Sequence, residues 1–518
     1  MNPCGWAPRP PAPGRTIEGM CTMADNGSAA TSAAAPKKMG FFPLMFTVIT
    51  LIVGGGVFSL CSDMVAAGAD GQSVIDAWVI SGIGVFCLMF TFFTLSRVKP
   101  ELKGGIYAYA TEGFGQFSGF TSAWGYWISA AFCIISYCPL LFSALGYFFP
   151  VFGDGTNLAS VIGASVVVWF YVFVVSRGVT EAAIVNVVVT LAKLIPIFTA
   201  ILAIIFLQAF DPSVFMANMH AATVDPTTGA VLSDSDKVLA ALTTTIWVFI
   251  GIEGAVAISG RAESDHDVGR ATIVAFVCVL IIYLLISLLG LGVMPIEDLA
   301  ALDNPPLAGL MEVAVGQWGA TLINFGVVLS LVGSMLGYTV LTSEVPFEAA
   351  QTGAGFPKAF AKSNEKGAPI TTLIVSGVIV EVFLFVMMVS SNTYQFFYTI
   401  STGLILLPYL FSAAYLIKVA FSESSGFAGK VRGHVGLYRA LSIVALVYAL
   451  LLFYATGTTG LAITSFLYAP GVLVYLYSKH ERGEKDLFST PVDKLMLIVT
   501  LIMLVLAIYW MATGQVAI

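Results

Sequence analysis

Apolar stretches of about 20 residues recur along the chain from residue 41 onward, and short polar segments separate them. A helix of this length and character crosses the ~30 Å hydrocarbon core of a lipid bilayer. We place thirteen such stretches, at approximately 41–67, 76–96, 121–149, 158–176, 181–207, 238–260, 270–293, 318–343, 370–390, 394–418, 437–455, 459–478 and 493–513. The pattern predicts an all-α polytopic membrane protein with about 13 transmembrane helices.

The first stretch contains three successive glycines near its middle, Gly54, Gly55 and Gly56. Each glycine costs about 1 kcal/mol relative to alanine inside a helix, and an unpaired backbone group in the bilayer costs several kcal/mol. A helix that unwinds at the membrane midplane explains the glycines if its freed backbone groups bind a small charged ligand. Close packing of neighbouring helices against the glycines is the alternative, and this stretch alone favours neither interpretation.

The sixth stretch holds a carboxylate, Glu253, between Gly251 and Gly254. A charge at that depth costs roughly 2.5–3.5 kcal/mol on insertion scales, which makes Glu253 a candidate functional residue. Interrupted helices in corresponding positions of two halves indicate a transporter built from inverted repeats. Because the first and sixth spans are five apart, we expect a first five-span repeat at 39–210, a second at 211–420 and additional C-terminal spans at 421–518.

The distribution of basic residues predicts the orientation. The segment 1–38 is rich in Pro, Ala, Gly and Ser and reads as a disordered tail. If this tail is cytoplasmic and the spans alternate, 21 of the 23 Lys and Arg residues fall on the cytoplasmic side. The chain is therefore expected to be a multi-pass protein of the cell (plasma or inner) membrane with a cytoplasmic N-terminus.

The composition excludes several classes of function. Of the 518 residues, 58% are hydrophobic and only 10% are charged, whereas roughly 25% charged is usual in soluble domains. The seven cysteines form no CxxC pair and the four histidines fall in loops, so neither a disulfide framework nor a metal site is expected. We find no catalytic motif, and we expect no enzyme activity, no cofactor and no nucleic-acid partner. A channel is an alternative that would need rings of charge or carbonyls along a pore.

Four segments resemble motifs of the amino acid–polyamine–organocation superfamily. They are GGGVF at 54–58, GGIYAY at 104–109, WVFIGIE at 247–253 and PY at 408–409. The thirteenth span, which follows FSTP at 488–491, is most similar to basic amino acid/polyamine antiporters of the arginine/ornithine branch. The resemblance implies a LeuT-like 5+5 inverted repeat in which spans 1 and 6 are broken.

The resemblance also implies how a substrate amino acid is held. The backbone N–H groups of Gly55 and Gly56 would bind its carboxylate at the positive end of a half-helix. Carbonyls of the broken spans would take its ammonium group, and these belong to Ile52, Trp247 and Ile250. Two side chains, Tyr338 and Ser401, would contact the rest of the substrate. In span 3, Ile134 and Tyr137 occupy the positions of two residues that contact the substrate in the arginine/agmatine exchangers. This difference favours a substrate with a different distal head group.

Gating and coupling residues follow from the same resemblance. Trp247 would close over the substrate, where its indole face suits a cationic side chain, although core packing is an alternative role for it. Tyr126, Glu253 and Tyr409 would form a second gate. Lys193, in the fifth span, would replace the sodium ion of sodium-coupled relatives and reach toward unwound span 1. Either a fixed positive charge or a proton-coupling site fits this lysine, and snorkelling to the interface is a third alternative.

The resulting prediction is a secondary active antiporter that exchanges cationic amino acids, arginine for ornithine or a similar amine, by alternating access. Proton-coupled uptake of neutral or acidic amino acids is the alternative. The expected partners are small amino acid substrates and the lipid bilayer, and formation of a homodimer is left open.

Overall fold

A computed structural model of the chain describes residues 40–102, 104–178, 183–225, 229–254, 265–388, 393–431 and 433–516. The chain divides into two units, 1–37 and 38–518, and the helices described below all belong to the second. The predicted disordered tail at 1–38 lies outside the described residues.

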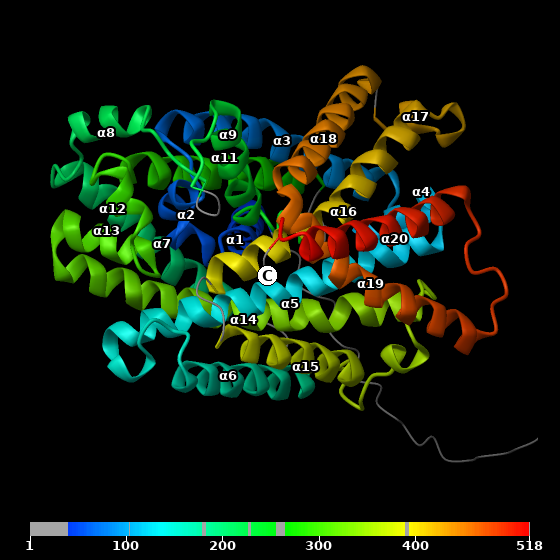
Figure 1. Cartoon of the computed structure of the whole chain (residues 1–518). Helices are drawn as coiled ribbons and strands as arrows, with labels where there is room; N and C mark the ends of the chain where they lie inside the picture. The colour runs from blue at the N-terminus through cyan, green and yellow to red at the C-terminus, as the bar shows by residue number, and fades with distance from the viewer. Residues whose placement is uncertain are drawn as a thin grey trace, which may run out of the picture. The chain divides into compact units, whose positions relative to one another are not determined.

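The described part of the chain is built almost entirely from helices (Figure 1). Those of the first half are α1 (Phe41–Ile52), η1 (Gly56–Phe58), α2 (Leu60–Ala66), α3 (Gly71–Val98), α4 (Ile106–Phe114), α5 (Gln116–Phe148), η2 (Pro150–Phe152), α6 (Leu158–Ser176), α7 (Ala183–Phe206), α8 (Pro212–Met219) and α9 (Asp234–Trp247). Those of the second half are α11 (Asp265–Gly290), α12 (Ile296–Ala300), α13 (Pro306–Val315), α14 (Gln317–Gln351), η4 (Lys358–Ala361), α15 (Ile370–Met387), α16 (Thr393–Phe421), η5 (Glu423–Ser425), α17 (Phe427–Lys430), α18 (Val435–Ala455), α19 (Gly457–Arg482) and α20 (Pro491–Ala512).

Eleven of the described helices are long and apolar enough to cross a membrane. They are α3, α5, α6, α7, α11, α14, α15, α16, α18, α19 and α20. Each matches one predicted stretch, although α14 continues to Gln351, beyond the predicted end at 343. The two predicted stretches that remain are the first and the sixth. The first is divided into α1, η1 and α2, and α9 forms the start of the sixth. The predicted polytopic all-α fold is therefore confirmed.

A short helix, one glycine and a very long helix recur in both halves of the chain. In the first half, Gly115 joins α4 to the 33-residue α5 at a φ of 123°. In the second half, Gly316 joins α13 to the 35-residue α14 at a φ of 85°. These backbone angles favour glycine, since a side chain is strained there. Two copies of one local design in corresponding places support the inverted repeat.

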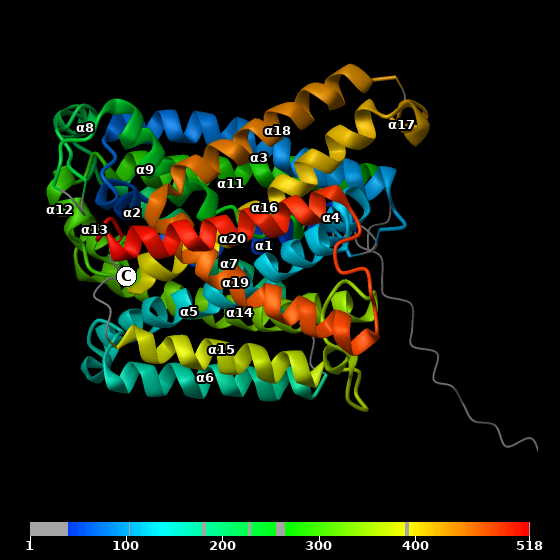
Figure 2. The ribbon, with the colours of Figure 1, turned by 45° about the vertical axis from the view of Figure 1, so that its right-hand side comes forward.

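The two copies also lie at opposite ends of the helix bundle. One end carries α8, α12 and α13, and we call it the α8 end (Figures 1 and 2). The other carries α4 and α17, and we call it the α4 end. The short helices α4 and α13 thus fall on opposite sides, as a repeat that is inverted in the membrane requires.

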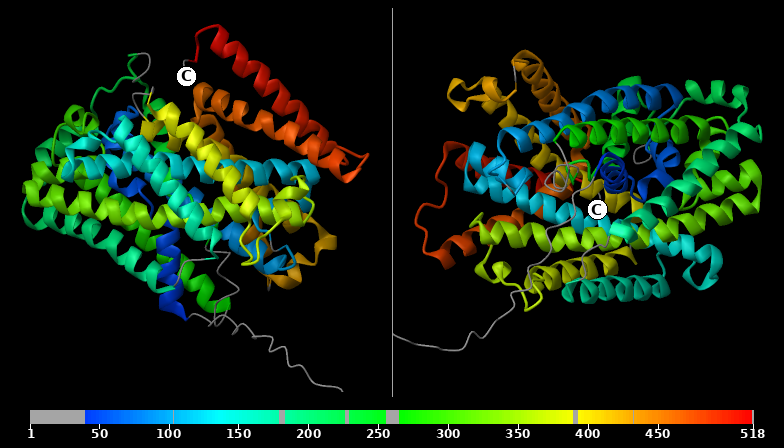
Figure 3. Two further views of the ribbon diagram at one scale, coloured as in Figure 1. Left: turned by 90° about the horizontal axis from the view of Figure 1, so that it is seen from below. Right: turned by 180° about the vertical axis from the view of Figure 1, so that it is seen from behind.

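Helices that correspond to each other in the two repeats pack together around the broken spans. The long helices α5 and α14 pack against each other, and α16 packs along α5. Next to α5 and α14, α6 and α15 lie side by side, as Figures 1 and 2 both show. The C-terminal helices α19 and α20 pair as a hairpin, whose last helix is drawn red in Figure 3.

The last helix also caps α5. Asp493, on α20, is fully buried, and its Oδ1 accepts the Ser118 backbone N–H at 2.9 Å and the Ser118 hydroxyl at 3.1 Å. The first N–H groups of a helix have no partner within the helix, so a carboxylate beside them is stabilising. This contact fixes the C-terminal hairpin to the beginning of the third span.

A buried ion pair holds the broken spans together at the α8 end. Lys237 on α9 donates to Asp70, the residue that caps α3, at 2.8 Å, and also to the carbonyl of Ala221 at 3.0 Å. Burial raises the pKa of the Asp70 carboxyl, but hydrogen bonds from Lys237 and Ser73 outweigh it and hold the pKa below its ordinary value. The turn after α2 and the start of α9 are thereby joined.

Candidate substrate site at the two broken helices

The first span breaks immediately before the three glycines. Helix α1 ends at Ile52, and Val53 is extended, with a ψ of 97°. The chain then turns through Gly55 into η1 and re-enters a helix at Leu60. The predicted unwinding of span 1 is therefore present at 53–55.

Lys193 binds the carbonyls that this break leaves unpaired. In an uninterrupted helix, the carbonyls of Thr50 and Val53 would accept the N–H groups of Gly54 and Val57. Here the Lys193 ammonium donates to Val53 O at 2.8 Å and to Thr50 O at 3.3 Å. The lysine is only 2% exposed. A snorkelling side chain would reach the interface instead, so this geometry excludes the snorkelling alternative.

The sixth span breaks at its tryptophan and meets the first. Helix α9 ends at Trp247, and a series of turns follows to Gly254. Gly251 has a φ of 107°, and a Cβ added there would lie 2.2 Å from the carbonyl oxygen of Leu51. Only glycine fits this close approach of the two broken spans. The remainder of the predicted sixth span, 255–260, lies outside the described residues.

One tyrosine that the sequence reading did not single out joins the two breaks. Tyr283 on α11 is fully buried, and its hydroxyl lies 3.0 Å from Val248 O and 3.3 Å from Ile52 O. These carbonyls belong to the sixth and first spans, respectively. The carbonyl of Ile52, predicted to take the substrate ammonium, thus has a protein donor in this structure.

Aromatic side chains cover the three glycines. A Cβ added to Gly54 would lie 2.5 Å from the Tyr137 hydroxyl, and one added to Gly56 would lie 2.7 Å from Trp247 Nε1. The Tyr137 ring also contacts Tyr338, with 5.7 Å between the ring centroids. The glycines therefore lie at the break of the first span and are also closely packed. Helix unwinding and close packing, which the sequence left as alternatives, thus occur together.

Trp247 is held between helices. Its ring stacks on Tyr398 of α16 at a centroid distance of 5.3 Å and an interplanar angle of 18°. It also contacts the Tyr137 ring at 5.9 Å, and its Nε1 donates to the Tyr394 hydroxyl at 3.2 Å. The indole therefore lies where the breaks, α5 and α16 converge.

The three residues predicted to form the second gate lie close together. The Tyr409 hydroxyl donates to Glu253 Oε2 at 2.6 Å, and the Gly251 N–H donates to the same oxygen at 3.1 Å. Tyr126 also interacts electrostatically with this carboxylate. Residues from the sixth, third and tenth spans thus meet at one buried carboxylate.

The remaining predicted residues lie at the same centre. Ile52, Ile250 and Ser401 are buried. The Ser401 hydroxyl lies 3.0 Å from the Ser129 hydroxyl and 3.1 Å from Cys133 Sγ, so it contacts α5.

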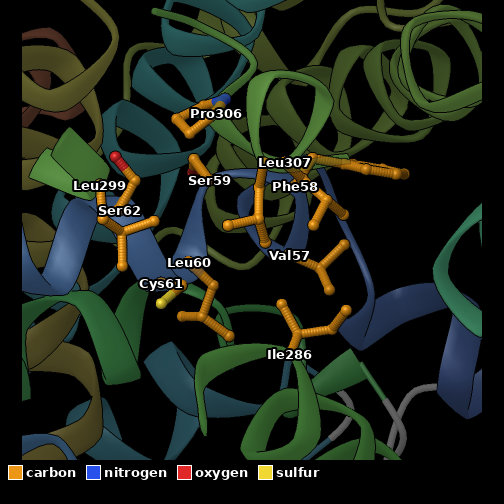
Figure 4. Close-up of a pocket in the computed structure, with 11 residues that line it drawn as sticks. Val57, Phe58, Ser59, Leu60, Cys61, Ser62, Ile286, Leu299, Pro306 and Leu307 are labelled. Atoms are coloured by element: carbon orange, nitrogen blue, oxygen red, sulfur yellow. The ribbon is translucent and has the colours of Figure 1, made fainter. Parts of the chain in front are cut away.

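A small cavity lies on another side of the unwound segment. Its lining includes Val57, Leu60, Cys61, Ile286 and Leu307, together with the polar residues Ser59 and Ser62 (Figure 4). Its volume of about 10 Å³ suits a single water molecule at most. The cavity is therefore too small to be the place of an amino acid substrate.

Two further carboxylates inside predicted spans escaped the sequence reading. Asp63 on α2 is 2% exposed, and Glu381 on α15 accepts hydrogen bonds from Ser165 and Trp169. The criterion that selected Glu253, an ionisable residue inside a span, would have found both.

Comparison with known proteins agrees with this architecture, which is that of a membrane carrier with two broken helices. The model of the amino acid permease family matches residues 39–476. An arginine/ornithine antiporter of Pseudomonas aeruginosa is 39% identical over 93% of this chain and 99% of its own length. Arginine/agmatine antiporters of Chlamydia pneumoniae and Chlamydia caviae are 36% and 35% identical over 93% of this chain and 98% of their own lengths.

This chain therefore belongs to the amino acid permease family, and the membership predicted from its motifs is confirmed. Among solved structures, a substrate-bound, outward-open Na⁺-coupled sialic acid symporter aligns with a TM-score of 0.48 at 15% identity, over 80% of this chain and 90% of that one. That likeness adds nothing to the assignment.

Proposed function

We propose that this protein is a secondary active antiporter that exchanges cationic amino acids, arginine for ornithine or a similar amine, across the cell membrane. The observation that carries the proposal is the meeting of two broken spans, at Gly251 and Leu51, with the indole of Trp247 against Gly56 of the first break. The full-length similarity to arginine/ornithine and arginine/agmatine antiporters supports the choice of substrate.

The backbone at the breaks is suited to an amino acid. The N–H groups of Gly55 and Gly56, at the start of η1, offer a carboxylate the positive end of a half-helix. Carbonyls of Ile52, Trp247 and Ile250 offer acceptors to the ammonium group. The single proton of the Tyr283 hydroxyl is shared between Val248 O at 3.0 Å and Ile52 O at 3.3 Å, so Ile52 O keeps capacity to accept the substrate ammonium.

Side chains from three helices bind the rest of the substrate and close the site. Tyr338 of α14 and Ser401 of α16 lie near α5, where the distal part of the substrate would extend. Trp247 closes the α8 side of the site. The cluster of Tyr126, Glu253 and Tyr409 closes the α4 side.

The α4 end of the bundle faces the cytoplasm, with the N-terminus on the same side. The distribution of Lys and Arg supports this orientation, since basic loops stay on the cytoplasmic side. Alternating access then requires two states. In one, the Trp247 contacts open while the Glu253 contacts stay closed, and in the other, the Glu253 contacts open while the Trp247 contacts stay closed.

Counterflow in proteoliposomes tests the substrate class. Vesicles loaded with ornithine, agmatine, leucine or glutamate receive labelled arginine outside, with empty vesicles as the control. We expect internal ornithine to accelerate arginine uptake several-fold, and leucine and glutamate to leave it at the level of empty vesicles. Equal acceleration by all four compounds, or by none, would contradict the proposed substrate class.

A further inference from the structure

Asp63 lies on the α8 side of the breaks, opposite to the Glu253 cluster. It is on α2, one turn beyond Ser59, whose hydroxyl donates to Asp63 Oδ2 at 2.5 Å. Gln395 of α16 donates its side-chain amide to Oδ1 at 2.9 Å. Both carboxylate oxygens are thus bound by neutral donors, and one of these donors belongs to another helix.

In the part of the chain that the structure describes, Asp63 forms no ion pair with a basic side chain. A buried carboxylate is costly unless it is paired or strongly hydrogen-bonded, so its two donors have to remain close while it is buried. The burial of the Asp63 carboxyl group therefore depends on the contact between α2 and α16.

A chain of hydrogen bonds connects Asp63 to the gate tryptophan. The Ser59 hydroxyl lies 3.0 Å from the Tyr394 hydroxyl, which accepts the N–H of Trp247 at 3.2 Å. The carboxylate and the indole thus share one polar cluster between α2, α9 and α16. Opening the site toward the α8 end requires this cluster to separate.

Separation takes Gln395 away from Asp63 and leaves a carboxylate beside the opened path. A guanidinium or ammonium group satisfies such a carboxylate with charge-assisted hydrogen bonds, whereas a neutral side chain leaves it unpaired. We propose that Asp63 is a specificity-determining residue that receives the cationic head group of a substrate moving between the α8 side and the unwound glycines. This inference rests on the proposed exchange of cationic amino acids.

The small cavity of Figure 4, which lies beside the same segment, has no charged residue in its lining. Its polar lining residues are Ser59 and Ser62, and both are neutral. Asp63 is thus the charged residue of α2, and its contact with Gln395 places it toward α16. A cationic head group therefore meets a charge only on the side that carries Asp63.

The test compares Asp63→Asn with the wild type in proteoliposomes, for arginine and for citrulline, its uncharged analogue of similar shape. We expect the KM for arginine to rise about tenfold or more, the usual effect of losing one charged hydrogen bond. The ratio of kcat/KM for arginine to that for citrulline should fall by a similar factor, since citrulline does not need the charge.

Two matched variants separate recognition from structure. Glu381→Gln makes the same chemical change at another intramembrane carboxylate, between α6 and α15, and should leave the ratio unchanged. Gln395→Ala removes the neighbouring donor and keeps the charge, so the preference for arginine should persist. This second variant keeps the inference testable if Asp63→Asn does not fold.

The possible failures are distinguishable. An unchanged arginine-to-citrulline ratio in Asp63→Asn would overturn the inference, and so would an equal loss for both compounds, which indicates a purely structural role. Loss of the arginine preference in Gln395→Ala would overturn it as well. A wild type that exchanges no cationic amino acid would instead refute the proposed function.

Discussion

Replacing Lys193 by alanine is expected to lower exchange by about a hundredfold or more while the protein still reaches the membrane. The ammonium makes two charge-assisted hydrogen bonds, to Thr50 O and Val53 O, and each is worth roughly 1.5–3 kcal/mol. Without it, two carbonyls at the break lose their donor in a buried place. The unwound geometry that positions the Gly55 and Gly56 N–H groups then loses the support of this lysine. Uptake of labelled arginine into ornithine-loaded vesicles measures the loss.

Control variants define what the lysine does. Lys494→Ala, at an exposed position on α20, should exchange like the wild type. Lys193→Arg should rescue only part of the activity, because a guanidinium is larger and stays charged. If wild-type exchange depends on pH and Lys193→Arg abolishes this dependence, the lysine is a proton-coupling site. If wild-type exchange does not vary with pH, the lysine is a fixed positive charge. Near-normal exchange by Lys193→Ala, or a sodium requirement in the wild type, would refute its role as a substitute for sodium.

Replacing Trp247 by leucine should leave a folded protein whose exchange is reduced at least about tenfold. The variant loses the hydrogen bond to Tyr394 and the stacking on Tyr398. Aromatic pairs contribute roughly 0.5–1.5 kcal/mol each, and a cation on an indole face contributes ~0.5–2 kcal/mol. Rates of arginine exchange, measured on protein that elutes as a single species, report the effect.

Two further tryptophan variants serve as controls for Trp247→Leu. Trp318→Leu makes the same change at a 51% exposed position on α14 and should have no effect on exchange. Trp247→Phe keeps a ring and loses the N–H donor, so an intermediate rate is expected. If Trp247→Leu transports as well as the wild type, the indole only fills space in the core.

The sequence was sufficient for the spans and for the breaks, because both depend on local properties. Apolar length alone located the eleven long helices. The three glycines and Gly251 indicated the breaks, since glycine is costly in a continuous helix. The start of α5 and the end of α14 were less well predicted, because these segments mix polar and apolar residues and do not extend the apolar stretches in the sequence.

Contacts between distant residues could not be obtained in this way. Lys193 was singled out as a charge inside a span, but its acceptors were defined only once the break was located at Val53. Tyr283 carried no signal, because a tyrosine in an apolar helix is ordinary and its two carbonyl partners are 35 and 231 residues away. Asp63 did carry a signal, but the meaning of its charge depends on Gln395 and Tyr394, which only the fold brings near.

Obligate exchange is the central claim, and a single comparison of two sets of proteoliposomes tests it most directly. One set contains ornithine without a pH gradient, and the other contains no amino acid and has a pH gradient directed inward. Labelled arginine should accumulate only in the first set, since the carrier reorients when substrate occupies the site and returns with ornithine. Accumulation in the second set to the same level would contradict the account and establish proton-coupled uptake.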